Sequence, residues 1–239
     1  DPEGKIQCEP ERDKRLLLAT LYHLDSAVGE MLKALEETGQ RDETIILFFF
    51  DNGPWVDNNG GGYPDNYPLE NYNQPDALRG KKLDVYEGGI HVPGFINWPG
   101  KISPQRVIPY VHIVDWFPTI AALAGYNTRK DVAWDGVNLE PLLTGDTDFR
   151  MPDRDLYWIW HPNTNRWSLR YKKWKIVRYS QEEPDDPGDW ELYNLKNDPG
   201  EKYNIAESRP EIVEMLHGRF LKQRALDYKG ELLKMDDPE

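Results

Sequence analysis

The sequence predicts an α/β protein in which a partial mixed sheet, sandwiched by helices, is followed by a smaller antiparallel α+β domain. Residues 44–50 (TIILFFF) form a short unbroken apolar run, which is the pattern of a strand buried on both faces. After Gly145 the chain changes to short aromatic segments, which are typical of antiparallel strands. We therefore expect residues 1–148 to belong to the α/β domain and residues 149–239 to form the smaller domain.

Periodicity and capping residues predict the remaining elements of the first part. A helix is expected over residues 15–35, with one buried stripe formed by Leu17, Leu21, Leu24, Val28, Met31 and Leu35. A second strand is expected at residues 94–98. A helix over residues 116–124 would have Asp115 as its N-cap, with Gly125 just past its end.

The second part reads as a small sheet followed by a helix. Four strands are expected in the segments LYWIW, RWSLRY, WKIVRY and WELYNL, with a hairpin turn at residues 171–174. The last helix would begin at Ser208, where Ser208 and Glu211 have the spacing of a capping box. The basic residues between 170 and 175 are expected to be a solvated turn, with a polyanion site as the minority alternative.

Composition excludes several classes of partner. The formal charge of −13, from 42 acidic and 29 basic residues, argues against nucleic acid or an anionic membrane surface, because both bind clustered Lys and Arg. No apolar stretch approaches the length of a membrane span. The single cysteine leaves the redox compartment undetermined.

Two oxygen-bearing side chains follow the apolar run directly. Asp51 and Asn52 lie at the end of the predicted strand, where open α/β sheets bind ligands, and their carboxylate and amide oxygens suit Ca²⁺, with Mg²⁺ as the alternative. An Asn-Gly turn with a structural role is the competing interpretation. The loop at residues 53–74 is long enough to be a lid or specificity loop.

Five segments in order resemble the downstream half of the type I sulfatases, the formylglycine-dependent members of the alkaline phosphatase superfamily. They are RDKRLLLATLYHLDSAVGEMLKALEETGQRDETIILFFFDNG, LRGKKLDVYEGGIHVP, INWPGKI, VHIVDWFPTIAALAG and DWELYNLKNDPGEKYNIA. The resemblance implies that the formylglycine and the other metal ligands lie in an upstream half. Cys8 formally satisfies the family's CxPxR signature, but its position and the two intervening glutamates indicate coincidence.

The resemblance also assigns roles to individual residues. Asp51 and Asn52 would bind the metal, and Lys82 would contact the sulfate oxygens and stabilise their charge in the transition state. Arg79 would support the loop, with Glu87 as its partner. His91 stands where the family has Arg, so its ion pair would be weaker and sensitive to pH. His112 is a candidate for a domain interface or for supporting the site.

The resulting hypothesis is a sulfuric ester hydrolase that acts on a sulfate ester, including sulfated carbohydrate, and needs its upstream half for activity. One alternative is a phosphodiesterase or phosphonate hydrolase of the same superfamily. Another is a non-catalytic remnant that binds sulfated glycans. A periplasmic, secreted or lysosomal location is expected from the resemblance alone.

Overall fold

The computed structural model describes residues 4–10, 12–55, 78–126, 134–160, 166–180 and 188–227. The chain divides into two compact units. Unit 1 consists of Asp1–Asp51, Trp55–Gln74 and Val92–Pro152. Unit 2 consists of Asn52–Pro54, Pro75–His91 and Asp153–Glu239, so two segments from the first half of the sequence belong to the unit that contains the C-terminal sheet.

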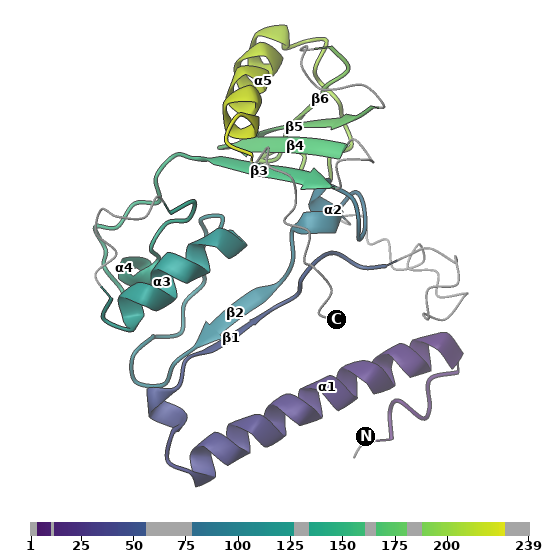
Figure 1. Ribbon diagram of the computed structural model, residues 1–239. Coiled ribbons are helices and arrows are strands. Elements are labelled where there is room, and N and C mark those ends of the chain that lie inside the picture. The colour runs from purple at the N-terminus through teal and green to yellow at the C-terminus, as the bar shows by residue number, and fades with distance from the viewer. Residues whose placement is uncertain are drawn as a thin grey trace, which may run out of the picture. The chain divides into compact units, whose positions relative to one another are not determined.

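Unit 1 contains a long helix and a strand pair (Figure 1). The helix is α1 (Arg12–Glu37), followed by the 3-10 turn η1 (Arg41–Glu43) and the strands β1 (Ile46–Phe49) and β2 (Gly94–Asn97). The strands are antiparallel, with Ile46 opposite Asn97 and Phe49 opposite Gly94. The predicted helix and both predicted strands are thereby confirmed.

The predicted burial of these two elements is wrong for the described part of the chain. No residue of β1 is fully buried, and Phe49 is 42% exposed. The apolar stripe of α1 is likewise open, with Leu21 44% and Met31 67% exposed. The apolar patterns determine which elements form, but no element described in unit 1 covers their apolar faces.

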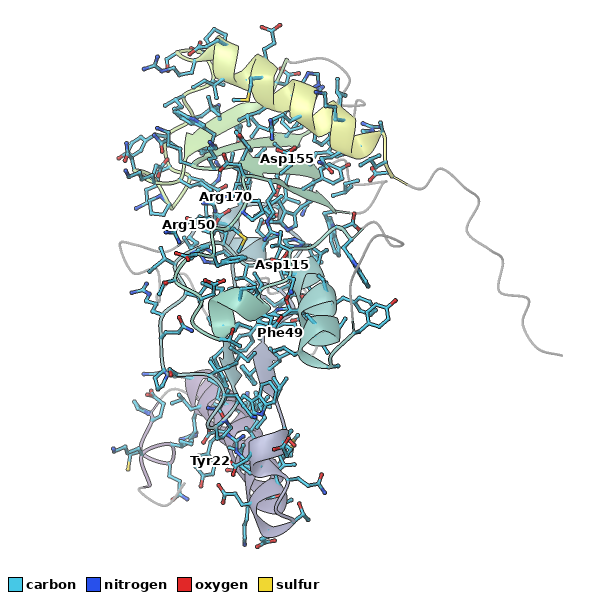
Figure 2. All side chains as sticks on the ribbon, turned by 90° about the vertical axis from the view of Figure 1, so that its left-hand side faces the viewer. Tyr22, Phe49, Asp115, Arg150, Asp155 and Arg170 are labelled. Atoms are coloured by element: carbon cyan, nitrogen blue, oxygen red, sulfur yellow. The ribbon has the colours of Figure 1, made fainter. Side chains whose placement is uncertain are left out.

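A buried carboxylate organises the rest of unit 1. The 3-10 turn η3 (Ile113–Asp115) leads into α3 (Trp116–Leu123), and α4 (Glu140–Leu143) follows. Asp115 has the predicted N-cap position of α3, but its side chain does not cap that helix. It accepts hydrogen bonds from the backbone N–H groups of His112 at 2.7 Å and Val137 at 2.9 Å. Figure 2 shows Asp115 beside these helices.

Unit 2 contains the predicted four-stranded antiparallel sheet, in the order β3-β4-β5-β6. The strands are β3 (Asp155–Trp160), β4 (Arg166–Tyr171), β5 (Trp174–Tyr179) and β6 (Glu191–Asn194). Tyr171 lies opposite Trp174, and Lys172 has a positive φ of 56° in the tight turn that joins β4 and β5. All four predicted strands and the predicted hairpin are confirmed.

The two faces of this sheet have different partners because side chains alternate along each strand. On one face, Leu169 and Ile176 pack with Leu216 and Phe220 of α5 (Pro210–Arg224), which lies beside the sheet in Figure 1. On the other face, Val177, Tyr193 and Leu195 form a second apolar cluster. Val85 and Tyr86, from the loop before α2 (Glu87–Ile90), belong to the same cluster.

The start of α5 differs from the prediction. The helix begins at Pro210, and its N-cap residue Arg209 makes no side-chain cap hydrogen bond. The Ser208 hydroxyl donates to the Ile205 carbonyl at 2.9 Å. The predicted capping box is therefore wrong, because this hydroxyl is used by the preceding turn. Across the residues with described positions, no helix is long and apolar enough to span a membrane.

Candidate functional site

The candidate site is built from Asn52–Pro54, which follows β1, and from the loop that carries Lys82, and both segments belong to unit 2. The Gly53 amide donates to the Gly89 carbonyl at 2.8 Å, and the Lys82 amide donates to the Pro54 carbonyl at 2.8 Å. A side chain at Gly53 would place its Cβ 1.8 Å from the Gly88 carbonyl oxygen. Glycine therefore permits this close approach of two backbones.

The side-chain amide oxygen of Asn52 is available to bind a ligand. Its Nδ2 donates to the Gly53 carbonyl at 2.9 Å, which orients the side chain and leaves Oδ1 without a described protein partner. The preceding residue, Asp51, is exposed, and within the residues described its carboxylate accepts no hydrogen bond and forms no ion pair. Two hard oxygen donors at consecutive positions fit a cation such as Ca²⁺.

These two residues can form only part of a metal site. In the described ranges, no group of three or more His, Cys, Asp or Glu residues could hold a metal ion. Because Ca²⁺ takes about 6–8 oxygen ligands, Asp51 and Asn52 require further donors. The predicted roles of both residues stay predictions.

Lys82 lies in a tight turn and keeps its ammonium uncommitted. Its side chain is part-buried, and it forms no ion pair or hydrogen bond with the residues that the structure describes. The turn is sharply bent on both sides, with φ of 92° at Gly80 and 79° at Leu83. Such a cation can bind an anion without first giving up a protein partner.

The other end of the same loop is held by buried charges. Lys175 of β5 is fully buried, and its Nζ lies 2.9 Å from Glu87 Oε1 and 2.8 Å from Glu201 Oε1. The Glu87 amide donates to Glu201 Oε2 at 2.7 Å. Arg170 of β4, labelled in Figure 2, is 3.4 Å from Glu87 Oε2, and His91 Nδ1 is 3.2 Å from the same oxygen.

Burial and these contacts together shift the pKa values of the two carboxylates in opposite directions. Burial would raise the pKa of Glu87, but the hydrogen bond from His91 and the charges of Lys175 and Arg170 lower it to about 2. Burial raises the pKa of Glu201, and Lys175 offsets this only in part. Glu87 is therefore the carboxylate that stays ionised over the whole neutral and mildly acidic range.

Arg79 has partners other than the expected one. Its Nη1 donates to the Tyr193 hydroxyl at 2.6 Å and lies 3.4 Å from Glu191 Oε2, while its guanidinium lies 3.9 Å from the centre of the Tyr86 ring. The expected pairing with Glu87 is wrong because Lys175 and Arg170 occupy that carboxylate. Through Tyr193 and Glu191, Arg79 connects the loop to β6.

The buried network was not predicted, because the basic residues between 170 and 175 have the pattern of a solvated turn. Only 4% of Arg170 and none of Lys175 is exposed, so that interpretation is wrong for both. Strand alternation is the signal that could have found them, since both residues occupy the face opposite to Leu169 and Ile176. Glu201 carries no comparable signal.

The remaining predicted residues lie elsewhere or outside the description. His112 belongs to unit 1, where its Nδ1 accepts from the Val114 amide at 3.4 Å in the cap of η3. Cys8 is an exposed free thiol before α1. The predicted specificity loop lies outside the described residues from position 56 onward, so its role stays a prediction.

Comparison with known proteins identifies two family matches. The sulfatase family model matches residues 3–126. The model of the N-sulphoglucosamine sulphohydrolase C-terminal region matches residues 80–226. The two matches overlap in the loop that carries Lys82 and Glu87.

Curated relatives are similar over most of this chain. It is 30% identical to human arylsulfatase A over 231 residues, which are 87% of this chain and 43% of that protein. It is 29% identical to an N-acetylgalactosamine-6-O-sulfatase of Bacteroides thetaiotaomicron over 208 residues, 82% of this chain and 39% of that protein. The chain therefore spans about two fifths of the length of these relatives.

Solved structures share the fold. A structure described under the metabolism of multiple glycosaminoglycans by Bacteroides thetaiotaomicron matches with a TM-score of 0.68 and 27% identity, over 84% of this chain and 43% of that one. Ps i-CgsB in complex with k-i-k-neocarrahexaose matches with a TM-score of 0.71 and 24% identity, over 94% of this chain and 46% of that one. The latter likeness concerns the fold alone.

Proposed function

This chain belongs to the sulfatase family, and on that premise we propose that it is part of a sulfuric ester hydrolase, to which it contributes Lys82 for the sulfate and Asp51 and Asn52 for a divalent cation. The observation that carries the proposal is the hydrogen bond from the Lys82 amide to the Pro54 carbonyl. This bond joins the turn that carries the Lys82 ammonium to the segment that contains Asn52.

Lys82 suits the transferring group electrostatically. Sulfuryl transfer increases negative charge on the sulfate oxygens, and a preorganised ammonium stabilises this charge without costly reorganisation. The two backbone hydrogen bonds at Lys82 and Gly53 restrict the turn, which reduces the entropy lost when the ester is bound. Lys82 therefore orients the sulfate and stabilises its charge.

The cation would be Ca²⁺, with Mg²⁺ as the alternative, because both donors are hard oxygens. Asp51 would supply a negative oxygen and Asn52 a neutral one, and further ligands would come from an upstream half of the same enzyme. Formylglycine, also proposed for that half, would supply the nucleophile.

The proposed substrates include sulfated carbohydrate. One relative is named for an N-acetylgalactosamine sulfate, and this is the chemical class in which a search should begin. The acidic character of the chain, with a net charge of −13, favours discrete cationic side chains such as Lys82 over a broad basic surface for holding the sulfate.

The test uses the full-length protein and two adjacent lysines. Hydrolysis of 4-nitrophenyl sulfate is measured with Ca²⁺ or Mg²⁺ present, alongside bis(4-nitrophenyl) phosphate as the phosphodiester. Lys82→Ala should lower kcat for the sulfate by about 10²–10³-fold, as for the loss of one oxyanion donor. Lys81→Ala, in the same turn, should have a much smaller effect.

Three results would contradict the proposal. Equal loss in the two lysine variants would remove the assignment of Lys82. Preferential turnover of the phosphodiester would support a phosphodiesterase. Binding of sulfated oligosaccharides without any turnover would support a non-catalytic glycan-binding protein.

A further inference from the structure

The turn that carries Lys82 contains a backbone conformation that needs outside support. Leu83 has a φ of 79°, in the left-handed region that a residue with a branched side chain rarely adopts. Such a conformation persists only where surrounding contacts determine it. The residue directly after the proposed sulfate-binding lysine therefore depends on its neighbours.

Arg166, the first residue of β4, supplies that support. Its Nη1 donates to the Leu83 carbonyl at 2.6 Å and lies 3.1 Å from Asp84 Oδ1. The other oxygen of the same carboxylate, Oδ2, accepts from the Lys81 amide at 3.1 Å. One guanidinium thus holds the residue after Lys82 directly and the residue before it through Asp84.

Tyr179 of β5 completes the arrangement. It lies directly opposite Arg166 in the strand register, and the guanidinium is 5.1 Å from the centre of its ring. The Tyr179 hydroxyl donates to Asp84 Oδ1 at 3.2 Å and accepts from the Val85 amide at 3.2 Å. Arg166 and Tyr179 together connect the whole turn, from Lys81 to Val85, to the adjacent ends of the paired strands β4 and β5.

We propose that Arg166 is a positioning residue for Lys82, so that the C-terminal sheet directs the ammonium toward the sulfate. The inference rests on the proposed function and deepens it. Arg166 acts through Leu83 and Asp84, and its charge is paired with the Asp84 carboxylate, whose side chain is 15% exposed. It therefore contributes geometry, while Lys82 contributes the charge that meets the substrate.

The chain offers a closely matched control in Arg219. The Arg219 side chain is 32% exposed and lies 2.6 Å from the Asp155 carboxylate and 3.6 Å from the centre of the Tyr171 ring. Arg166 is 29% exposed and has the same two kinds of partner. Within the part of the chain that the structure describes, the Arg219 side chain contacts Asp155 and Tyr171 and not the Lys82 turn.

The first measurement is hydrogen exchange of the full chain, resolved to residues 81–85. Arg166→Gln should accelerate exchange there by at least about tenfold, while Arg219→Gln should leave these amides unchanged. This readout does not require catalytic activity, so it tests the positioning even if the proposed function is wrong. Unchanged exchange in Arg166→Gln overturns the inference.

The second measurement is a double-variant comparison in the full-length enzyme. Arg166→Gln should lower kcat for 4-nitrophenyl sulfate by about tenfold with a smaller change in KM, and it should cost nothing further when Lys82 is already Ala. A merely structural role would lower kcat equally in both backgrounds, and that result would overturn the inference.

A second variant keeps the inference testable if the first one does not fold. If Arg166→Gln does not fold, Asp84→Asn is used, because it weakens the same contacts with a nearly isosteric side chain. It must accelerate exchange at residues 81–85 while leaving β4 and β5 protected. Failure to do so overturns the inference.

Discussion

Replacing Lys175 by Met tests the buried charge network that anchors the other end of the Lys82 loop. Methionine has a similar length and no charge, so it fills the space but leaves two carboxylates without their shared cation. Glu87 is 6% exposed at its side chain and Glu201 is fully buried. Glu87 keeps Arg170 and His91, whereas Glu201 keeps only the Glu87 amide among the side-chain contacts described.

The expected loss of stability is large because an ionised carboxylate remains in a buried site. Removing one partner of a buried ion pair typically costs about 3–5 kcal/mol, most of it from the charge left behind. Domains are stable by only about 5–15 kcal/mol, so unit 2 should lose a substantial part of its stability. Adding Glu201→Gln should recover part of the loss, because a neutral amide carries no buried charge.

Native-state hydrogen exchange resolved to peptides of β4 and β5 measures this unit separately. Lys175→Met should accelerate exchange by about 10²–10⁴-fold. Lys172→Met is the control, because Lys172 is exposed and pairs at 2.6 Å with the equally exposed Asp153, so exchange should not change measurably. The reasoning is refuted if Lys175→Met behaves like Lys172→Met, or if adding Glu201→Gln brings no recovery.

Three further predictions concern acid stability, backbone approach and metal binding. The lowered pKa of Glu87 stabilises the fold above the unfolded value near 4.5, and this contribution should disappear as the pH falls toward 2. In urea unfolding from pH 6 to 2, the free energy of unfolding should fall less steeply in Glu87→Gln than in the unmodified protein, and parallel curves would contradict the assignment. Gly53→Ala should displace the Gly88 backbone, since the added Cβ would lie 1.8 Å from its carbonyl oxygen, and accelerated amide exchange at Gly53 and Gly89 would report it. Asp51→Ala in the full-length protein should weaken Ca²⁺ binding in calorimetry, whereas an unchanged Kd would remove Asp51 from the proposed metal site.

Local pattern was sufficient for the strands and for the longer helices of both units. The heptad-like spacing of α1, the apolar run of β1 and the alternation in β4 and β5 each depend on residues that are near one another in sequence, so periodicity predicts them. Gly39 ends α1 in the left-handed conformation, with a φ of 69°, as a helix-terminating glycine should. The start of α5 was placed too early because the Ser208 hydroxyl had a competing acceptor in the preceding turn.

The sequence by itself determined the strands, the helices α1, α3 and α5, the β4–β5 hairpin and the residue types available for binding a sulfate and a cation. Tertiary structure alone decided that Lys175 is a buried anchor and that Arg166 holds Leu83, since each of these contacts joins residues about eighty or more positions apart. Side-chain alternation shows only that a charged residue faces one side of a strand. Whether that side meets water or a buried carboxylate depends on the segment that folds back over it, which periodicity cannot encode.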